Sequence, residues 1–125
     1  MVRKTAILVD GAFYRKRATF LRGAKTPGER AKELYAYCMA HIRDEGTHDE
    51  YHEERELYRI FYYDCPPLKK TVYHPALKRN VDFGKSDTYS WANAFFEELK
   101  KKRKVALRMG ALSDANAHFS LKPDA

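Results

Sequence analysis

The sequence predicts an α/β fold in which helices cover both faces of a parallel β-sheet. Three short runs rich in strand-forming residues alternate with segments of helical periodicity, which is the pattern of β-α-β units with right-handed connections. Three strands with their helices make half of a doubly wound fold. The 125 residues are therefore expected to form one domain, or the N-terminal part of one, with a sheet that is incomplete.

The first half of the chain is predicted to contain one strand and two helices. Residues 5–9, Thr-Ala-Ile-Leu-Val, form a short apolar run between charged residues, which suits a strand buried on both faces. A short helix is expected over residues 13–22, and its apolar members are Phe13, Phe20 and Leu21. Apolar positions three and four residues apart predict a second helix over residues 29–45. These positions are Leu34, Tyr37, Cys38, His41 and Ile42.

The second half is predicted to contain two strands and one helix. Residues 57–63, Leu-Tyr-Arg-Ile-Phe-Tyr-Tyr, are rich in strand formers, and the two prolines that follow end the strand. Residues 69–85 show little periodicity and are expected to form a basic connection. The remaining elements are a helix over residues 88–103, capped by Ser86 or Asp87, and a strand over residues 105–112.

The charge balance points to an anionic partner. The chain has 24 Lys and Arg residues against 17 Asp and Glu, a net charge of +7 and a pI of about 9.4. An excess of this size on a small domain most often serves nucleic-acid binding. Many small basic proteins nevertheless bind no nucleic acid at physiological salt, so charge alone leaves both interpretations open.

The sequence shows neither a membrane span nor a secretory signal. The apolar stretch after Arg3 and Lys4 is only four residues long and ends in Asp10. The two cysteines, Cys38 and Cys65, match neither a disulfide framework nor a zinc motif. We therefore expect a cytoplasmic protein with reduced thiols and no membrane partner.

Two acidic residues, Asp10 and Asp64, directly follow predicted strands. If these strands are parallel neighbours, both carboxylates lie at the same edge of the sheet, where open parallel sheets bind ligands. Paired carboxylates there can hold Mg²⁺ or Mn²⁺, which would orient an attacking water toward a phosphodiester. The alternatives are that Asp10 caps a helix or shapes the turn before Gly11, and that Asp64 belongs to the turn before Cys65.

Basic and aromatic residues are predicted to flank this acidic edge. Arginines and lysines that follow either acid would neutralise phosphates, and tyrosines among them can stack on unpaired bases. The residues in question are Tyr14, Arg15, Lys16, Arg17, Lys69, Lys70 and Lys85. The alternative is a solvated charged face with Tyr14 in the core.

Three segments carry a resemblance to a known family. They are Ala-Ile-Leu-Val-Asp-Gly-Ala-Phe at residues 6–13, Leu-Tyr-Arg-Ile-Phe-Tyr-Tyr-Asp-Cys-Pro-Pro at residues 57–67, and Lys-Val-Ala-Leu-Arg-Met-Gly at residues 104–110. In order and spacing they resemble the NYN-domain family, which belongs to the PIN-like nuclease superfamily. Many relatives carry Asn two residues after the first Asp-Gly, whereas this chain has Ala12 and Phe13 there. It also lacks the Lys-Gly-Val-Asp and Gly-Asp-Ser-Asp segments.

The resemblance implies a metal-dependent endoribonuclease with a Rossmann-like, PIN-like α/β/α fold and Mg²⁺ or Mn²⁺ as its cofactor. Asp10 matches the family's first catalytic aspartate, and Asp64 matches an acid often found after the second strand. The alternative is a non-catalytic RNA-binding or protein-interaction module of the NYN type. Because an incomplete sheet leaves a strand edge unpaired, a homodimer or a missing C-terminal segment is expected to complete it.

Overall fold

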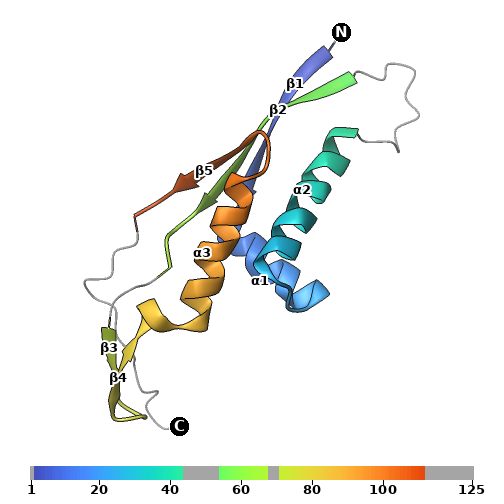
Figure 1. Ribbon diagram of the computed structural model, residues 1–125. Helices are drawn as coiled ribbons and strands as arrows, with labels where there is room; N and C mark the ends of the chain where they lie inside the picture. Colours follow the sequence, from blue (N-terminus) through green and yellow to red (C-terminus); the bar gives the residue numbers. More distant parts are fainter. Residues whose placement is uncertain (1, 44–53, 68–70, 112–125) are drawn as a thin grey trace.

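The protein is built around a three-stranded parallel sheet with the strand order β1-β2-β5 (Figure 1). The computed structural model describes residues 2–43, 54–67 and 71–111. The strands of this sheet are β1 (Val2–Asp10), β2 (Glu54–Asp64) and β5 (Val105–Met109). The helices are α1 (Gly11–Arg22), α2 (Pro27–Arg43) and α3 (Asp87–Lys100). An antiparallel hairpin, β3 (Thr71–His74) and β4 (Arg79–Asp82), and the 3₁₀ helix η1 (Phe83–Lys85) precede α3.

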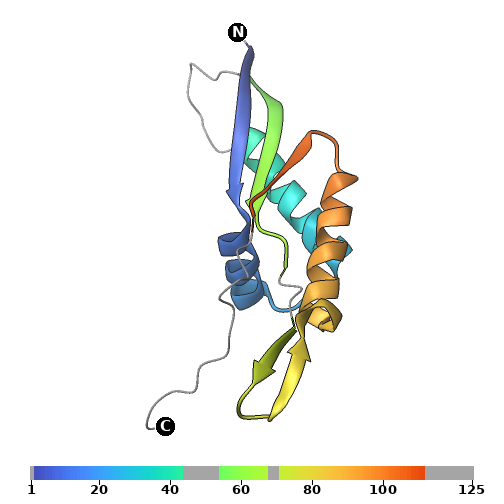
Figure 2. The ribbon, with the colours of Figure 1, turned by 90° about the vertical axis from the view of Figure 1, so that its left-hand side faces the viewer.

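Both helices that cover the sheet, α2 and α3, lie on the same face (Figure 2). The chain moves in one direction across the sheet, from β1 to β2 to β5. Successive right-handed crossovers in one direction place their helices on the same face. The prediction of an α/β fold with a parallel sheet is confirmed, whereas the prediction of helices on both faces is wrong for the described part of the chain.

The prediction that the first strand is buried on both faces is also wrong. Burial alternates along β1: Thr5, Ile7 and Val9 are partly buried under the helices, while Ala6 and Leu8 are exposed. The same alternation follows in β2, where Ile60 and Tyr62 are buried. Alternation with a period of two is typical of a sheet with one face on the core and one face in solvent.

The core lies between this sheet and the inner sides of α2 and α3. Tyr62 packs edge-on against Phe95 with ring centroids 5.7 Å apart, and Trp91 stacks on Phe95 at 5.2 Å. Leu34, Cys38 and Ile42 of α2 are buried in it as predicted. Other apolar positions predicted for the helices instead face solvent: Phe13, Phe20, Leu21, Tyr37 and His41.

Local sequence features predicted the start of α3 more accurately than they predicted the connection before it. Ser86 caps α3 as predicted, because its Oγ accepts a hydrogen bond from the Tyr89 backbone N–H at 3.1 Å. The segment expected to be an irregular connection contains the β3–β4 hairpin, in which Val72 pairs with Val81. Its turn places Lys78 at φ 53°, in the left-handed region that few side chains adopt. No glycine marks this turn, which is why the sequence did not indicate a hairpin.

A buried ion cluster ties α1 to α2. Arg30 is 1% exposed, and its Nη1 donates to Glu33 Oε1 at 2.8 Å. The Tyr14 hydroxyl donates to the same oxygen at 2.8 Å, and Lys25 Nζ lies 3.2 Å from Glu33 Oε2. Burial alone would raise the pKa of Glu33, but the hydrogen bonds from Arg30, Tyr14 and Lys25 outweigh it and lower the pKa to about 2.

We expect this cluster to make the fold sensitive to acid. A carboxyl group whose pKa is lowered in the folded state stabilises the fold above its ordinary pKa of 4.5, and this stabilisation is lost as the pH falls toward 2. The thermal midpoint should therefore fall steadily over that pH range, and Glu33→Gln should flatten the fall. Glu97→Gln removes an exposed carboxylate that pairs with Lys100 and should leave the acid limb unchanged. Parallel acid limbs for wild type and Glu33→Gln would contradict this account.

Candidate nucleic-acid interface

The carboxyl ends of the three strands meet at one edge, where the described residues form an open groove of about 1400 Å³. Gly110 continues β5 at this edge, and its backbone N–H donates to the Asp64 carbonyl at 2.8 Å. The opposite wall is the first turn of α3, with Ser86, Thr88 and Tyr89. Asp10 and Asp64 both line the groove, so the prediction that they share one edge of the sheet is confirmed.

Asp10 caps the first helix. Its Oδ1 accepts a hydrogen bond from the Phe13 backbone N–H at 3.2 Å, and its side chain is exposed. This geometry satisfies one of the free N–H groups at the start of α1. The structure therefore gives Asp10 the capping role that the sequence left open beside the catalytic one.

Asp64 is held by a fork of hydrogen bonds from α1. Arg15 Nε and Nη2 donate to the two carboxylate oxygens, each at 3.0 Å. The Tyr62 hydroxyl donates to Oδ2 at 2.9 Å, the Cys65 backbone N–H donates to Oδ1 at 2.7 Å, and the Asp64 side chain is only 3% exposed. Burial of the Arg15 guanidinium opposes its charge, but the paired carboxylate outweighs this and raises its pKa. Arg15, predicted to bind RNA, is thus the partner of Asp64.

The two carboxylates do not fit a site for Mg²⁺ or Mn²⁺. Both oxygens of Asp64 already accept charged hydrogen bonds from Arg15. Strand alternation places Asp10 on the same face as exposed Leu8, and Asp64 on the face of buried Tyr62, so the two side chains leave opposite faces of the sheet. Within residues 2–43, 54–67 and 71–111, no three His, Cys, Asp or Glu side chains gather to hold a metal ion.

The predicted basic residues are spread over several elements. Lys16 and Arg17 are exposed on α1, and Lys85 is exposed in η1. Lys69 and Lys70 lie outside the described residues. Tyr14 is partly buried and packs against the core; its hydroxyl donates to Glu33, and burial, followed by this carboxylate, raises its pKa. The core position that the sequence left open for Tyr14 is therefore the observed one.

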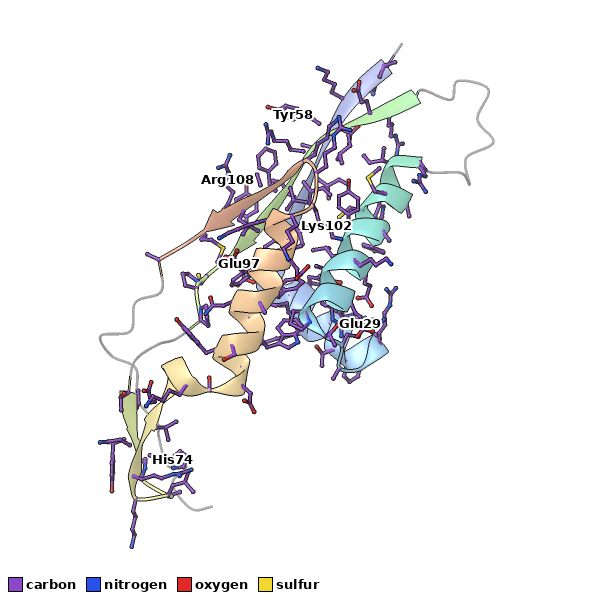
Figure 3. All side chains as sticks on the ribbon, in the orientation of Figure 1. Glu29, Tyr58, His74, Glu97, Lys102 and Arg108 are labelled. Atoms are coloured by element: carbon purple, nitrogen blue, oxygen red, sulfur yellow. The ribbon has the colours of Figure 1, made fainter. Side chains whose placement is uncertain are left out.

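We did not predict a second surface, which we call the open face: the side of the sheet away from α2 and α3. Its aromatic and basic members on β2 and β5 are Tyr58, Arg59, Phe61, Tyr63 and Arg108. The Arg108 guanidinium lies 5.3 Å from the centroid of the Phe61 ring, and the Tyr58 and Phe61 rings are 6.4 Å apart. Figure 3 shows Tyr58 and Arg108 on the same side of the sheet, away from Glu29 on α2.

A signal for this face was present in the sequence. Arg59 stands in the middle of the second strand, and an arginine at that position argues against burial of both faces. With a period of two, Arg59, Phe61 and Tyr63 share one face. β5 adds Arg108 directly beside Tyr63 in the parallel register.

Comparisons with known proteins identify no relative of this chain. No family model, curated protein or solved structure matches the sequence. None of the described helices is long and apolar enough to cross a membrane. The resemblance to the NYN-domain family thus rests on the three sequence segments alone and stays a prediction.

Proposed function

We propose that this chain is a single-stranded RNA-binding module and that the open face of its sheet is the binding surface. The observation that carries the proposal is the gathering of aromatic rings and arginines on a sheet face that none of the described helices covers. Arg59, Phe61 and Tyr63 line β2, and Arg108 lies beside Tyr63 on β5.

Both kinds of side chain suit an RNA strand. Exposed aromatic rings stack on unpaired bases, and each stack contributes about 1–3 kcal/mol. The arginines among the rings, together with the net charge of +7, neutralise phosphates. A duplex keeps its bases stacked inside, so a surface of this kind favours single strands.

The groove at the carboxyl edge extends this surface. Leu8, Tyr63 and Arg108 belong to the open face and also line the groove. The opposite wall is the start of α3, where Ser86 and Thr88 line the groove. An RNA strand on the open face would thus continue into the groove past Asp10. The resemblance to the NYN-domain family supports RNA as the ligand, but we propose no cleavage step, because Arg15 already occupies the Asp64 carboxylate.

Fluorescence anisotropy with a labelled single-stranded RNA of about 12 nucleotides tests the proposal. We expect salt-dependent binding that persists in EDTA and is weaker for a duplex of the same sequence. Arg108→Ala should weaken binding about fivefold or more, because it removes a phosphate or stacking contact. Arg43→Ala, which removes an exposed arginine at the end of α2 on the helix side, is the matched control and should bind like wild type.

Tyr63 supplies a second, independent variant. Tyr63→Ala should weaken binding because it removes the ring, whereas Tyr63→Phe keeps the ring and should retain affinity. Equal losses for Arg108→Ala and Arg43→Ala would contradict the open face as the binding surface. Cutting of the RNA that EDTA stops and Asp10→Asn abolishes would replace the binding module with the metal-dependent endoribonuclease.

A further inference from the structure

The first strand of the sheet has a free edge. β1 pairs with β2 along its whole length of nine residues, and no described strand pairs with its other side. A strand edge of this length exposes a row of backbone N–H and C=O groups that readily pair with another chain. Proteins commonly protect such an edge with a short strand, a proline or a covering loop, and residues 2–10 include no proline.

Apolar side chains gather beside this edge. Leu8, Phe13, Leu21 and Tyr37 come from β1, α1 and α2, and each is more than half exposed. They line one groove of about 380 Å³ along β1. Large apolar side chains gathered in one place on a soluble protein mark an interaction surface more often than an ordinary exterior.

We propose that a second copy of this chain occupies the edge, with the two β1 strands paired antiparallel about a two-fold axis at Ile7. Two-fold symmetric pairing is the commonest way in which identical chains assemble. An axis perpendicular to the sheet keeps α2 and α3 of both copies on one side. The two sheets then join into one continuous sheet, and their open faces become one surface.

The charges on β1 select this register. Side chains opposite one another in an antiparallel pair point to the same face, so the even-numbered exposed residues must face even-numbered ones. With Ile7 on the axis, Lys4 of each copy lies opposite Asp10 of the other, and Ala6 lies opposite Leu8. A shift of the axis by one residue toward either end places Asp10 opposite Val2 or Ala6, and both ion pairs are lost. Lys4 and Asp10 are exposed on the face of Leu8, so the pairs form without burial of either charge.

Charge reversal tests this arrangement in the full chain. Light scattering after size exclusion should show a dimer of the 14.6 kDa chain that dissociates on dilution. Lys4→Asp and Asp10→Lys should each weaken the dimer about tenfold or more, because each places like charges opposite one another twice. An equimolar mixture of the two variants should restore it, because every opposed pair is then of opposite charge.

Two controls separate the interface from unspecific effects. Lys32→Asp makes the same charge change at an exposed position of α2 and should dimerise like wild type. Asp10→Lys also removes the cap of α1, so circular dichroism must show that this variant is folded. If it is not, Lys4→Asp and the cysteine variant below decide the question.

Cysteines fix the register directly. A chain with Ala6→Cys and Leu8→Cys, in which Cys65→Ser removes the exposed native thiol, should form a dimer linked by disulfides on oxidation. A monomer at every concentration would overturn the proposal. So would a dimer that neither responds to Lys4→Asp nor forms the cross-link. None of these measurements uses RNA, so their outcome is independent of the RNA-binding proposal.

Discussion

Gly11→Ala should destabilise the fold severely, whereas Gly28→Ala should not. A β-carbon at Gly11 would lie far inside the van der Waals contact distance of the Tyr62 ring and 2.6 Å from its hydroxyl oxygen. Tyr62 cannot yield, because it is fully buried, packs against Phe95 and Phe96 and donates its hydroxyl to Asp64. Overpacking costs about 1–3 kcal/mol, and loss of the Tyr62 hydrogen bond adds about 1 kcal/mol.

Gly28→Ala is a matched control because it makes the same substitution in the first turn of a helix, at a position where the added β-carbon has room. A β-carbon there would lie 3.9 Å from the Glu98 carboxylate, which is an ordinary contact, and alanine favours the helix. Urea unfolding followed by circular dichroism should show a much lower midpoint for Gly11→Ala and an equal or higher midpoint for Gly28→Ala. Similar midpoints for the two variants would mean that α1 does not approach Tyr62 as closely as described.

Asp64→Asn should cost several kcal/mol of stability, whereas Asp10→Asn should cost almost nothing. Asparagine at position 64 keeps the shape but leaves the Arg15 charge without a carboxylate and turns one acceptor into a donor. Breaking a buried ion pair costs about 3–5 kcal/mol, and the 28% exposure of Arg15 reduces this to about 2–4 kcal/mol. At position 10 asparagine caps a helix as well as aspartate does.

The pair of Asp→Asn variants separates two accounts of the strand ends. If Asp10 and Asp64 were two equivalent, exposed metal ligands, the two variants should lose similar amounts of stability. If Asp64 anchors Arg15 and Asp10 caps α1, Asp64→Asn should lose much more stability than Asp10→Asn. Chemical unfolding of both variants without added metal measures the difference. An unchanged midpoint for Asp64→Asn would contradict the anchoring role of the Arg15–Asp64 pair.

The elements that the sequence predicted correctly are those set by local chemistry. Residues 5–9 and 57–63 became β1 and β2 because strand formers are followed by acids and glycine or proline. Ser86 capped α3 because its hydroxyl reaches the Tyr89 N–H three residues later. The parallel sheet and the shared edge of Asp10 and Asp64 follow from alternating strands and helices.

The features that the sequence did not predict depend on contacts between distant residues. Which face of the sheet stays open follows from strand order, and no periodicity in 5–9 or 57–63 encodes that order. Arg15 and Asp64 are 49 residues apart, so nothing local distinguishes an arginine that binds phosphate from one that holds a carboxylate. Phe13 and Leu21 are apolar members of α1, yet the buried residues of this helix are Gly11 and Ala18.

The most direct test of the RNA-binding proposal is photochemical cross-linking. A single-stranded RNA containing 4-thiouridine is bound to the chain in EDTA and irradiated, and the labelled peptides are mapped by mass spectrometry. The account predicts labels on the β2 and β5 peptides that carry Tyr58, Phe61, Tyr63 and Arg108. Labels confined to α2 and α3, with β2 and β5 unmodified, would contradict it.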